Sequence, residues 1–167
     1  VWANTQSFSQ AGSTENIVLN TNLDSDSAGI GGAGVTSSAL ALDSLVSDIA
    51  YTNLAADPRD STLVTTALGV AATDAADATA IQAAVTDLNT AIASGVAADI
   101  TTAASALDAL SPNVAYADLA ADLSDPKTPA LISAAQTQAT IDNASSTAIL
   151  SAVADLQSAV VTPSFDI

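Results

Sequence analysis

The side chains of this sequence that could bind an ion are almost all carboxylates. Eighteen Asp and Glu stand against two Lys and Arg, and the 167-residue chain has no Cys, His or Met. Calcium prefers carboxylate and carbonyl oxygens, whereas zinc and most transition metals prefer Cys or His. Nucleophilic catalysis usually needs His as its base. The composition therefore leaves calcium as the metal to consider and predicts a protein that is not an enzyme.

Asp24 and Asp26 form the first candidate for binding calcium. They open the segment Asp24-Ser25-Asp26-Ser27-Ala28-Gly29, whose alternating polar residues and glycine resemble the start of a helix-loop-helix calcium loop. Position twelve of such a loop carries a glutamate, and here it is Val35. A solvated polar turn is the competing interpretation of these residues. Two aspartate pairs, Asp57 with Asp60 and Asp122 with Asp125, are the second candidate for binding calcium. The competing interpretation is that they cap the helices that follow. No other cofactor is predicted.

Arg59 and Lys127 are the only two cationic side chains, and they occur in matching contexts. Asp57-Pro58-Arg59 returns as Asp125-Pro126-Lys127, 68 positions later. Lys127 is expected in an exposed turn. Each cation could pair with a nearby aspartate of its own chain, a contact that adds little stability if it is exposed. The alternative is that each meets an acidic patch on a neighbouring subunit, which makes both candidates for a subunit interface.

An internal duplication explains this return. Residues 80–92 and 148–160 are identical at seven of thirteen positions, at the same offset of 68. Upstream, residues 50–57 and 115–122 match at six of eight positions at an offset of 65, so the second copy carries a three-residue insertion. Similarity at a fixed spacing is typical of a repeated supersecondary unit.

The predicted fold class is mainly α, a helical bundle built from two tandem three-helix repeats. Residues 1–35 are expected to form an extended, partly β-like arm with a Gly-rich joint. Residues 36–162 hold the bundle, with repeat one at about 37–95 and repeat two at about 101–161. Residues 163–167 are a C-terminal tail.

In repeat one, the first helix is expected to start near Ser37 and to end near Asp57. Its apolar residues recur at helical spacing and are Leu42, Leu45, Val46, Ile49 and Leu54. Asp57 would cap a second, short helix with Pro58 in its first turn. A third helix would begin around residues 74–77 and end at Gly95.

In repeat two, Pro112 is expected to break the counterpart of the first helix. A short helix through Tyr116 and Leu119 follows, and Asp125 with Pro126 would start the next. Pro129 fits that helix only if the helix starts near Thr128 or if Pro129 lies within the first turn. Tyr51 and Tyr116 occupy equivalent positions and are predicted to be buried, with hydroxyls that reach a backbone partner.

Two terminal segments carry the other predicted interface residues. Trp2, Phe8 and the strand-like run Ile17-Val18-Leu19 lie in the arm, and Phe165 with Ile167 lie in the tail. A frayed arm is the simpler interpretation. The alternative is that the arm docks onto a neighbouring subunit, by adding a strand or an apolar anchor.

Charge and hydropathy limit the partners. A formal net charge of -16 opposes binding to nucleic acid or an anionic membrane, and no apolar run reaches the roughly 18 to 20 residues of a membrane span. Copies of the chain also repel one another, although screening shortens to about 3 Å at molar salt. Because the chain starts at Val1 without an initiator Met, we expect an exported protein, extracellular or at the cell surface.

Two functions fit these expectations. The first is a self-assembling structural subunit of an extracellular filament or surface layer, in which the arm engages neighbouring subunits and the partner is the protein itself. The alternative is a secreted helical bundle that binds a lipid, another apolar ligand or an apolar surface.

Overall fold

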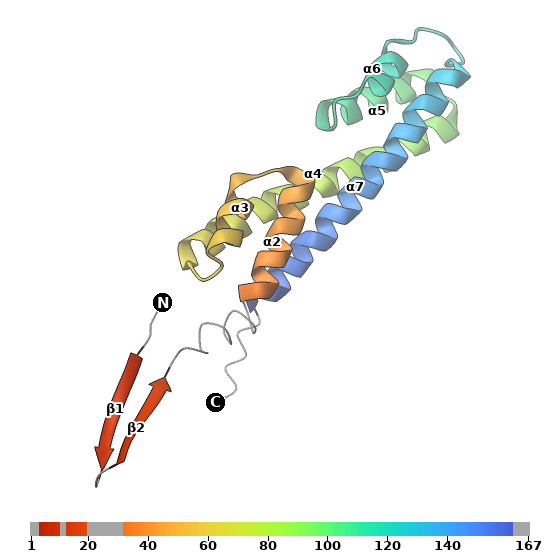
Figure 1. Ribbon diagram of the computed structural model, residues 1–167. Helices are drawn as coiled ribbons and strands as arrows, with labels where there is room; N and C mark the ends of the chain where they lie inside the picture. Colours follow the sequence, from red (N-terminus) through yellow and green to blue (C-terminus); the bar gives the residue numbers. More distant parts are fainter. Residues whose placement is uncertain (1–3, 11–12, 20–31, 162–167) are drawn as a thin grey trace. The chain divides into compact units, whose positions relative to one another are not determined.

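The computed structural model describes residues 4–10, 13–19 and 32–161 of the chain (Figure 1). This part is mainly helical. Its elements, in chain order, are β1 Asn4–Gln10, β2 Ser13–Leu19, α2 Ala33–Val46, α3 Ile49–Ala56, α4 Ser61–Ser94, α5 Ala97–Leu110, α6 Val114–Ala121 and α7 Pro129–Val161.

Strands β1 and β2 form an antiparallel hairpin. Asn4 lies opposite Leu19, and Gln10 lies opposite Ser13. The run Ile17-Val18-Leu19 belongs to β2. Five residues with predicted roles lie outside the described residues, and those predictions stay predictions: Trp2, Asp24, Asp26, Phe165 and Ile167.

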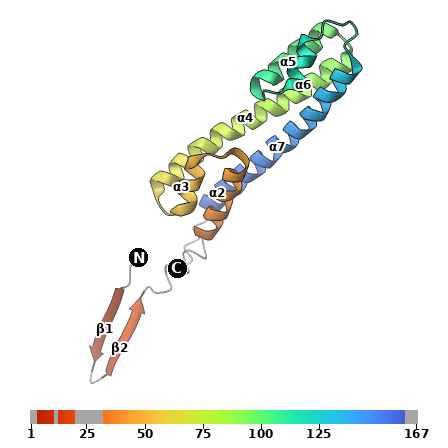
Figure 2. The same cartoon turned by 45° about the horizontal axis from the view of Figure 1, so that its top comes forward.

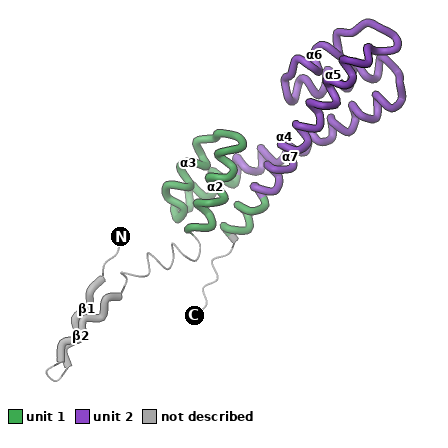
Figure 3. The backbone as a smooth tube through the Cα atoms, turned by 45° about the vertical axis from the view of Figure 1, so that its right-hand side comes forward, with its two compact units in different colours: residues 1–68, 154–167 green, residues 69–153 purple. Residues whose placement is uncertain are grey.

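The chain divides into two compact units (Figure 3). Unit 1 comprises residues 1–68 and 154–167, and unit 2 comprises residues 69–153. Unit 1 therefore contains α2, α3, the first turns of α4 and the end of α7. Unit 2 contains the remainder of α4 and α7 together with α5 and α6.

Unit 2 is a four-helix arrangement around one apolar core. Figures 1 and 2 both show α5 and α6 side by side, together with the adjoining parts of α4 and α7. Each helix contributes to the core: Val85, Leu88, Ile100, Leu107, Tyr116, Leu119, Ala135 and Ala139. Alanine faces on α7 meet large residues on the other helices, and burial of this apolar surface is the main stabilising term.

Unit 1 buries a similar set of residues. Val35, Ala39 and Leu42 of α2 are buried, as are Tyr51 and Leu54 of α3. The two helices are joined by a hydrogen bond from the Thr36 hydroxyl to the Ala55 carbonyl at 3.3 Å. A Cβ built on Gly34 would lie 3.8 Å from Cβ of Ala159, an ordinary van der Waals contact, so the start of α2 packs beside the end of α7.

The prediction of a single first helix between residues 37 and 57 is wrong, because two helices, α2 and α3, occupy this stretch. Ser47 has a φ of 56°, in the left-handed region, and its N–H donates to the Asp43 carbonyl at 2.8 Å, which ends α2. Asp48 then caps α3 by accepting from the Ala50 N–H at 2.8 Å. The expected apolar face is wrong as well, because only Leu42 and Leu54 of its large residues are buried. Two helices at a corner bury different faces than one straight helix would.

The expected break near residue 74 is also absent, since α4 runs unbroken for 34 residues. Asp60, not Asp57, caps it by accepting from the N–H groups of Thr62 at 2.7 Å and Leu63 at 3.2 Å. Alanine, the strongest helix former, fills much of this stretch. The end predicted at Gly95 is confirmed, with a φ of 73°.

The prediction that Pro112 separates two helices is confirmed by α5 and α6. Asn113 caps α6 by accepting from the Ala115 N–H at 3.0 Å. Pro129 is the first residue of α7, a position where its missing N–H costs nothing. The expected helix start at Asp125 and Pro126 is wrong, because these residues lie in the loop before α7.

Buried positions recur at the two offsets found in the sequence. At an offset of 65, Val35, Ala39, Leu42, Tyr51 and Leu54 correspond to Ile100, Ala104, Leu107, Tyr116 and Leu119. At an offset of 68, Ala67, Ala71, Ala78, Ala84, Val85 and Leu88 correspond to Ala135, Ala139, Ser146, Ala152, Val153 and Leu156. Every member of both lists is buried.

Candidate functional site

The two cationic side chains have different surroundings. Arg59 is exposed. Lys127 is only 5% exposed, and its Nζ donates a hydrogen bond to the backbone carbonyl of Asp122. The expectation of an exposed turn is therefore wrong for Lys127. The loop between α6 and α7, residues 122–128, is longer than its counterpart, residues 57–60, and it supplies the carbonyl that the lysine amine contacts.

This loop, residues 122–128, is held by its own polar groups. The Asp122 carboxylate accepts from the Ser124 N–H at 3.0 Å and from the Thr128 N–H at 2.7 Å. These backbone donors, Thr128 first and then Ser124, hold the pKa of Asp122 well below its ordinary value because they stabilise the charged form. The Lys127 bond to the same residue closes the loop, so its backbone is tied at both ends.

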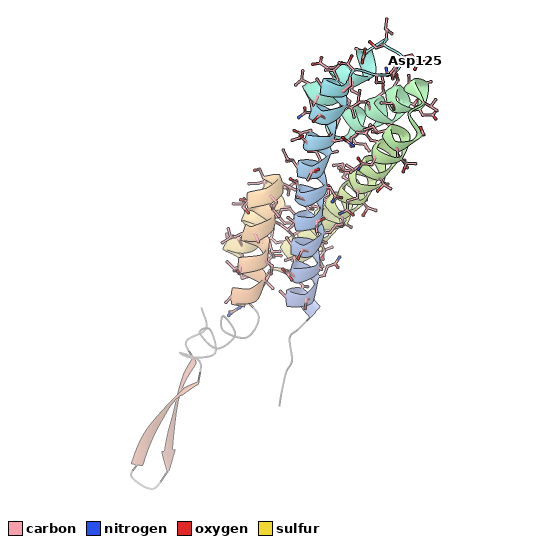
Figure 4. The ribbon with its side chains drawn as sticks, turned by 90° about the vertical axis from the view of Figure 1, so that its right-hand side faces the viewer. Asp125 is labelled. Carbon is pink, nitrogen blue, oxygen red and sulfur yellow. The ribbon has the colours of Figure 1, made fainter. Side chains whose placement is uncertain are left out.

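Leu123 projects from this loop into solvent. Its side chain is 97% exposed, the largest exposed fraction among the large apolar residues described. Ser124 and Asp125 beside it are exposed too, and Figure 4 labels Asp125 in the segment that leads into α7. A fixed loop thus carries an isolated leucine with a carboxylate two residues away.

A hollow of about 570 Å³ lies in unit 1 at the corresponding loop of the first half. It is formed by the first turns of α2, residues 32–40, and by Asp57, Pro58 and Arg59. Its lining is mostly apolar, with Leu40 half exposed at one side and the Arg59 side chain at another. The hollow is open to solvent and carries no pair of groups suited to acid-base catalysis.

Four further large apolar side chains are exposed at equivalent places in the two halves. Leu45 and Ile49, at the α2–α3 corner, are 44% and 69% exposed. Leu110 and Val114, 65 positions later at the α5–α6 corner, are 45% and 72% exposed. Exposed apolar side chains that cluster mark interaction surfaces more often than isolated ones do.

A second, smaller hollow of about 390 Å³ lies between α4 and α5 in unit 2. Asp87 and Asp99 line it together with Thr90, Ser94 and Thr102. Within the described ranges, no group of three or more acidic residues is placed to hold a metal ion. None of the helices described is long and apolar enough to cross a membrane.

Tyr116 and Asp142 form a partly buried polar contact. The tyrosine hydroxyl donates to Oδ2 of Asp142 at 2.6 Å, and Gln138 donates to Oδ1 of the same carboxylate at 2.9 Å. Burial, and then the bond and charge of Asp142, raise the pKa of Tyr116. Burial of both tyrosines is confirmed, but the Tyr116 hydroxyl reaches a carboxylate where a backbone partner was expected. This contact joins α6 to α7 and has a structural role.

Sequence reasoning overlooked Leu123 and the matched apolar pairs. A leucine between Asp122 and Ser124 is an apolar residue in a polar loop, and it belongs to the insertion that changes the offset from 65 to 68. An apolar residue within an inserted polar segment is the signal from which an exposed leucine could be predicted. Comparison of the chain with protein-family models, curated proteins and solved structures found no match.

Proposed function

We propose that this chain is a non-enzymatic structural protein, a self-assembling subunit of an extracellular filament or surface layer. Its body is a helical bundle built from two copies of one three-helix segment. The arm, with Trp2, Phe8 and the run Ile17-Val18-Leu19, engages neighbouring subunits, and the tail residues Phe165 and Ile167 take part in the same contacts. Arg59 lies at a subunit interface, and Lys127 lies near one.

The matched exposed apolar pairs carry this proposal. Leu45 and Ile49 in the first half and Leu110 and Val114 in the second are exposed to similar degrees. Each half therefore offers an equivalent apolar surface, and a subunit that is to join several others needs more than one.

The acidic surface makes assembly depend on ions. At a formal net charge of -16, copies repel one another at low ionic strength. Salt shortens the range of that repulsion to about 3 Å at 1 M, which lets apolar contacts form. Calcium, as a carboxylate-binding ion, would have the same effect at lower concentration.

The test is sedimentation of the full-length chain over a series of salt and calcium concentrations. Monomers at low salt and large species at high salt are expected. The double variant Ile49→Asp with Val114→Asp should shift assembly to higher protein concentration. The control Asn53→Asp with Thr140→Asp adds the same charge at exposed positions on α3 and α7. A wild-type chain that remains monomeric throughout would contradict the proposal.

The alternative function is a secreted bundle that binds a lipid or another apolar molecule. The open hollow near Leu40 and Pro58 favours its outer surface over its interior, because the described core is filled by its own side chains. Native mass spectrometry separates the two proposals. A bound lipid on protein from its natural source, together with a monomer at all salt concentrations, would support the alternative.

A further inference from the structure

We propose that the loop 122–128 of one copy docks in the hollow beside Arg59 of a second copy, with Leu123 as the apolar anchor. This inference rests on the proposed self-assembly and names the surfaces that would carry it. The two surfaces arise at corresponding positions of the two halves. A short loop before α4 leaves a hollow, and a longer loop before α7 forms a projection.

The projecting loop has the properties of an anchor. Its backbone is held by the Asp122 carboxylate, which accepts from two N–H groups, and by the Lys127 amine on the Asp122 carbonyl. A segment already held in one shape loses little conformational entropy on binding. Leu123, at 97% exposure, has nearly all of its apolar surface available for burial, which stabilises a complex in proportion to the area removed from water.

The hollow has room for this anchor and a mostly apolar lining. Its volume of about 570 Å³ exceeds that of one leucine side chain and leaves room for the neighbouring backbone. The hollow is lined by the small residues Gly32 and Ala33 together with Pro58, and the Leu40 side chain borders it. An isolated leucine would be buried there without placing a charge in an apolar space.

The charges are complementary as well. Arg59 is the exposed one of the chain's two cationic side chains, and it lies at the hollow. Asp125 is exposed on the projecting loop, two residues from Leu123. The rest of the acidic surface repels other copies of the chain. An acidic loop is therefore repelled least where a cation borders the hollow. Asp57, which also lines the hollow, repels the acidic loop and so weakens this attraction.

Such a contact is heterologous, because the two surfaces that meet are different. Heterologous contacts produce closed rings or open filaments and leave each copy able to bind two others. The inference thus gives the proposed polymer a direction, which an assembly through the matched apolar pairs alone would not do.

The experiment exploits the absence of cysteine from the chain. Two single-cysteine variants, Ser124→Cys on the loop and Ser37→Cys at the hollow, are mixed at an assembling salt concentration and treated with a short bismaleimide. A covalent dimer containing one of each variant is expected. The control replaces Ser37→Cys by Ser105→Cys, an exposed position on α5, and should give only background dimer.

Two sets of substitutions test the energetics by sedimentation. Leu123→Asp should raise the protein concentration needed for assembly about 30-fold, as loss of an interface anchor does. Arg59→Asp and Asp125→Arg should each weaken assembly by about two- to fivefold, and the two combined in one chain should restore it. Leu123, Arg59 and Asp125 are all exposed, and circular dichroism verifies that the variants fold.

The outcomes separate this inference from the proposed function. Wild-type assembly that persists unchanged in Leu123→Asp, with cross-linking at background, overturns the docking proposal and leaves self-assembly standing. A wild-type chain that is monomeric at every salt concentration overturns both. Cross-linking above background together with rescue by the charge exchange supports both.

Discussion

The hydroxyl of Tyr116 donates a hydrogen bond of 2.6 Å to Oδ2 of Asp142, joining residues that are 26 positions apart. The tyrosine side chain is fully buried, and the carboxylate is partly buried. Asp142 also accepts from Gln138, one helical turn earlier on α7. The contact therefore fixes the short helix α6 against α7 at one point.

Tyr116→Phe should lower the free energy of unfolding by about 2 kcal/mol, because a hydrogen bond to a charged group is lost and its carboxylate is left partly buried. Urea unfolding followed by circular dichroism measures this change. Thr140→Val is the control, since the Thr140 hydroxyl donates only to the Gln136 carbonyl on an exposed surface. An equal loss in both variants would contradict a special role for the tyrosine.

Stability should also fall at alkaline pH. Burial raises the pKa of Tyr116, and the bond and charge of Asp142 add to the effect. The folded chain therefore keeps the phenol protonated where the unfolded chain, with a pKa of about 10, does not. The contribution is complete below about pH 10 and is lost as pH rises toward the raised folded pKa. Unfolding midpoints between about pH 8 and 12 should fall less steeply in Tyr116→Phe than in the wild type.

Lys127→Met should destabilise the chain by about 1 to 3 kcal/mol, because it leaves the Asp122 carbonyl without the donor that covers it. Arg59→Met, at the equivalent and exposed position, should change stability by no more than about 0.5 kcal/mol. Chemical denaturation of both variants measures the difference. Equal effects would show that burial of Lys127 does not matter to the fold.

Ala135→Leu should destabilise unit 2 by about 1 to 3 kcal/mol through overpacking. Ala135 is fully buried in a core with Leu88 and Leu107, so the added carbons have no space. Ala134→Leu, at the exposed neighbouring position, should be nearly neutral. Thermal unfolding compares them, and a neutral Ala135→Leu would indicate a loosely packed core.

Deletion of residues 1–30 should leave the helical circular dichroism signal nearly unchanged and should prevent assembly. The proposed arm contacts are lost, whereas the described helices all begin at Ala33 or later. Sedimentation at high salt is the measurement. Normal polymers from the shortened chain would remove the arm from the proposed function, and the cross-linking of Ser124→Cys to Ser37→Cys would then show whether the loop contact is sufficient.

Local chemistry explains which helix ends could be predicted. Pro112 separates α5 from α6 and Gly95 ends α4, because the missing N–H of proline and the left-handed conformation of glycine act wherever they occur. Ser47 ends α2 with the same left-handed conformation, but serine adopts it only when the surrounding packing demands it. The residue type at position 47 therefore does not predict the corner between α2 and α3. Without that corner, the exposure of Leu45 and Ile49 cannot be predicted either.

The amino-acid sequence alone determined that the protein is helical, that its apolar positions recur at offsets of 65 and 68, and that its chemistry rests on carboxylates. These properties follow from the composition of the chain and from the spacing of its apolar residues, and both can be read directly from the sequence. Only the tertiary structure decided that Lys127 is buried while Arg59 is exposed, and that Leu123 projects into solvent. The reason is that burial depends on what the rest of the chain places around a residue. The loop that carries Leu123 and Lys127 is three residues longer than the loop that carries Arg59, so the matched cations have different surroundings.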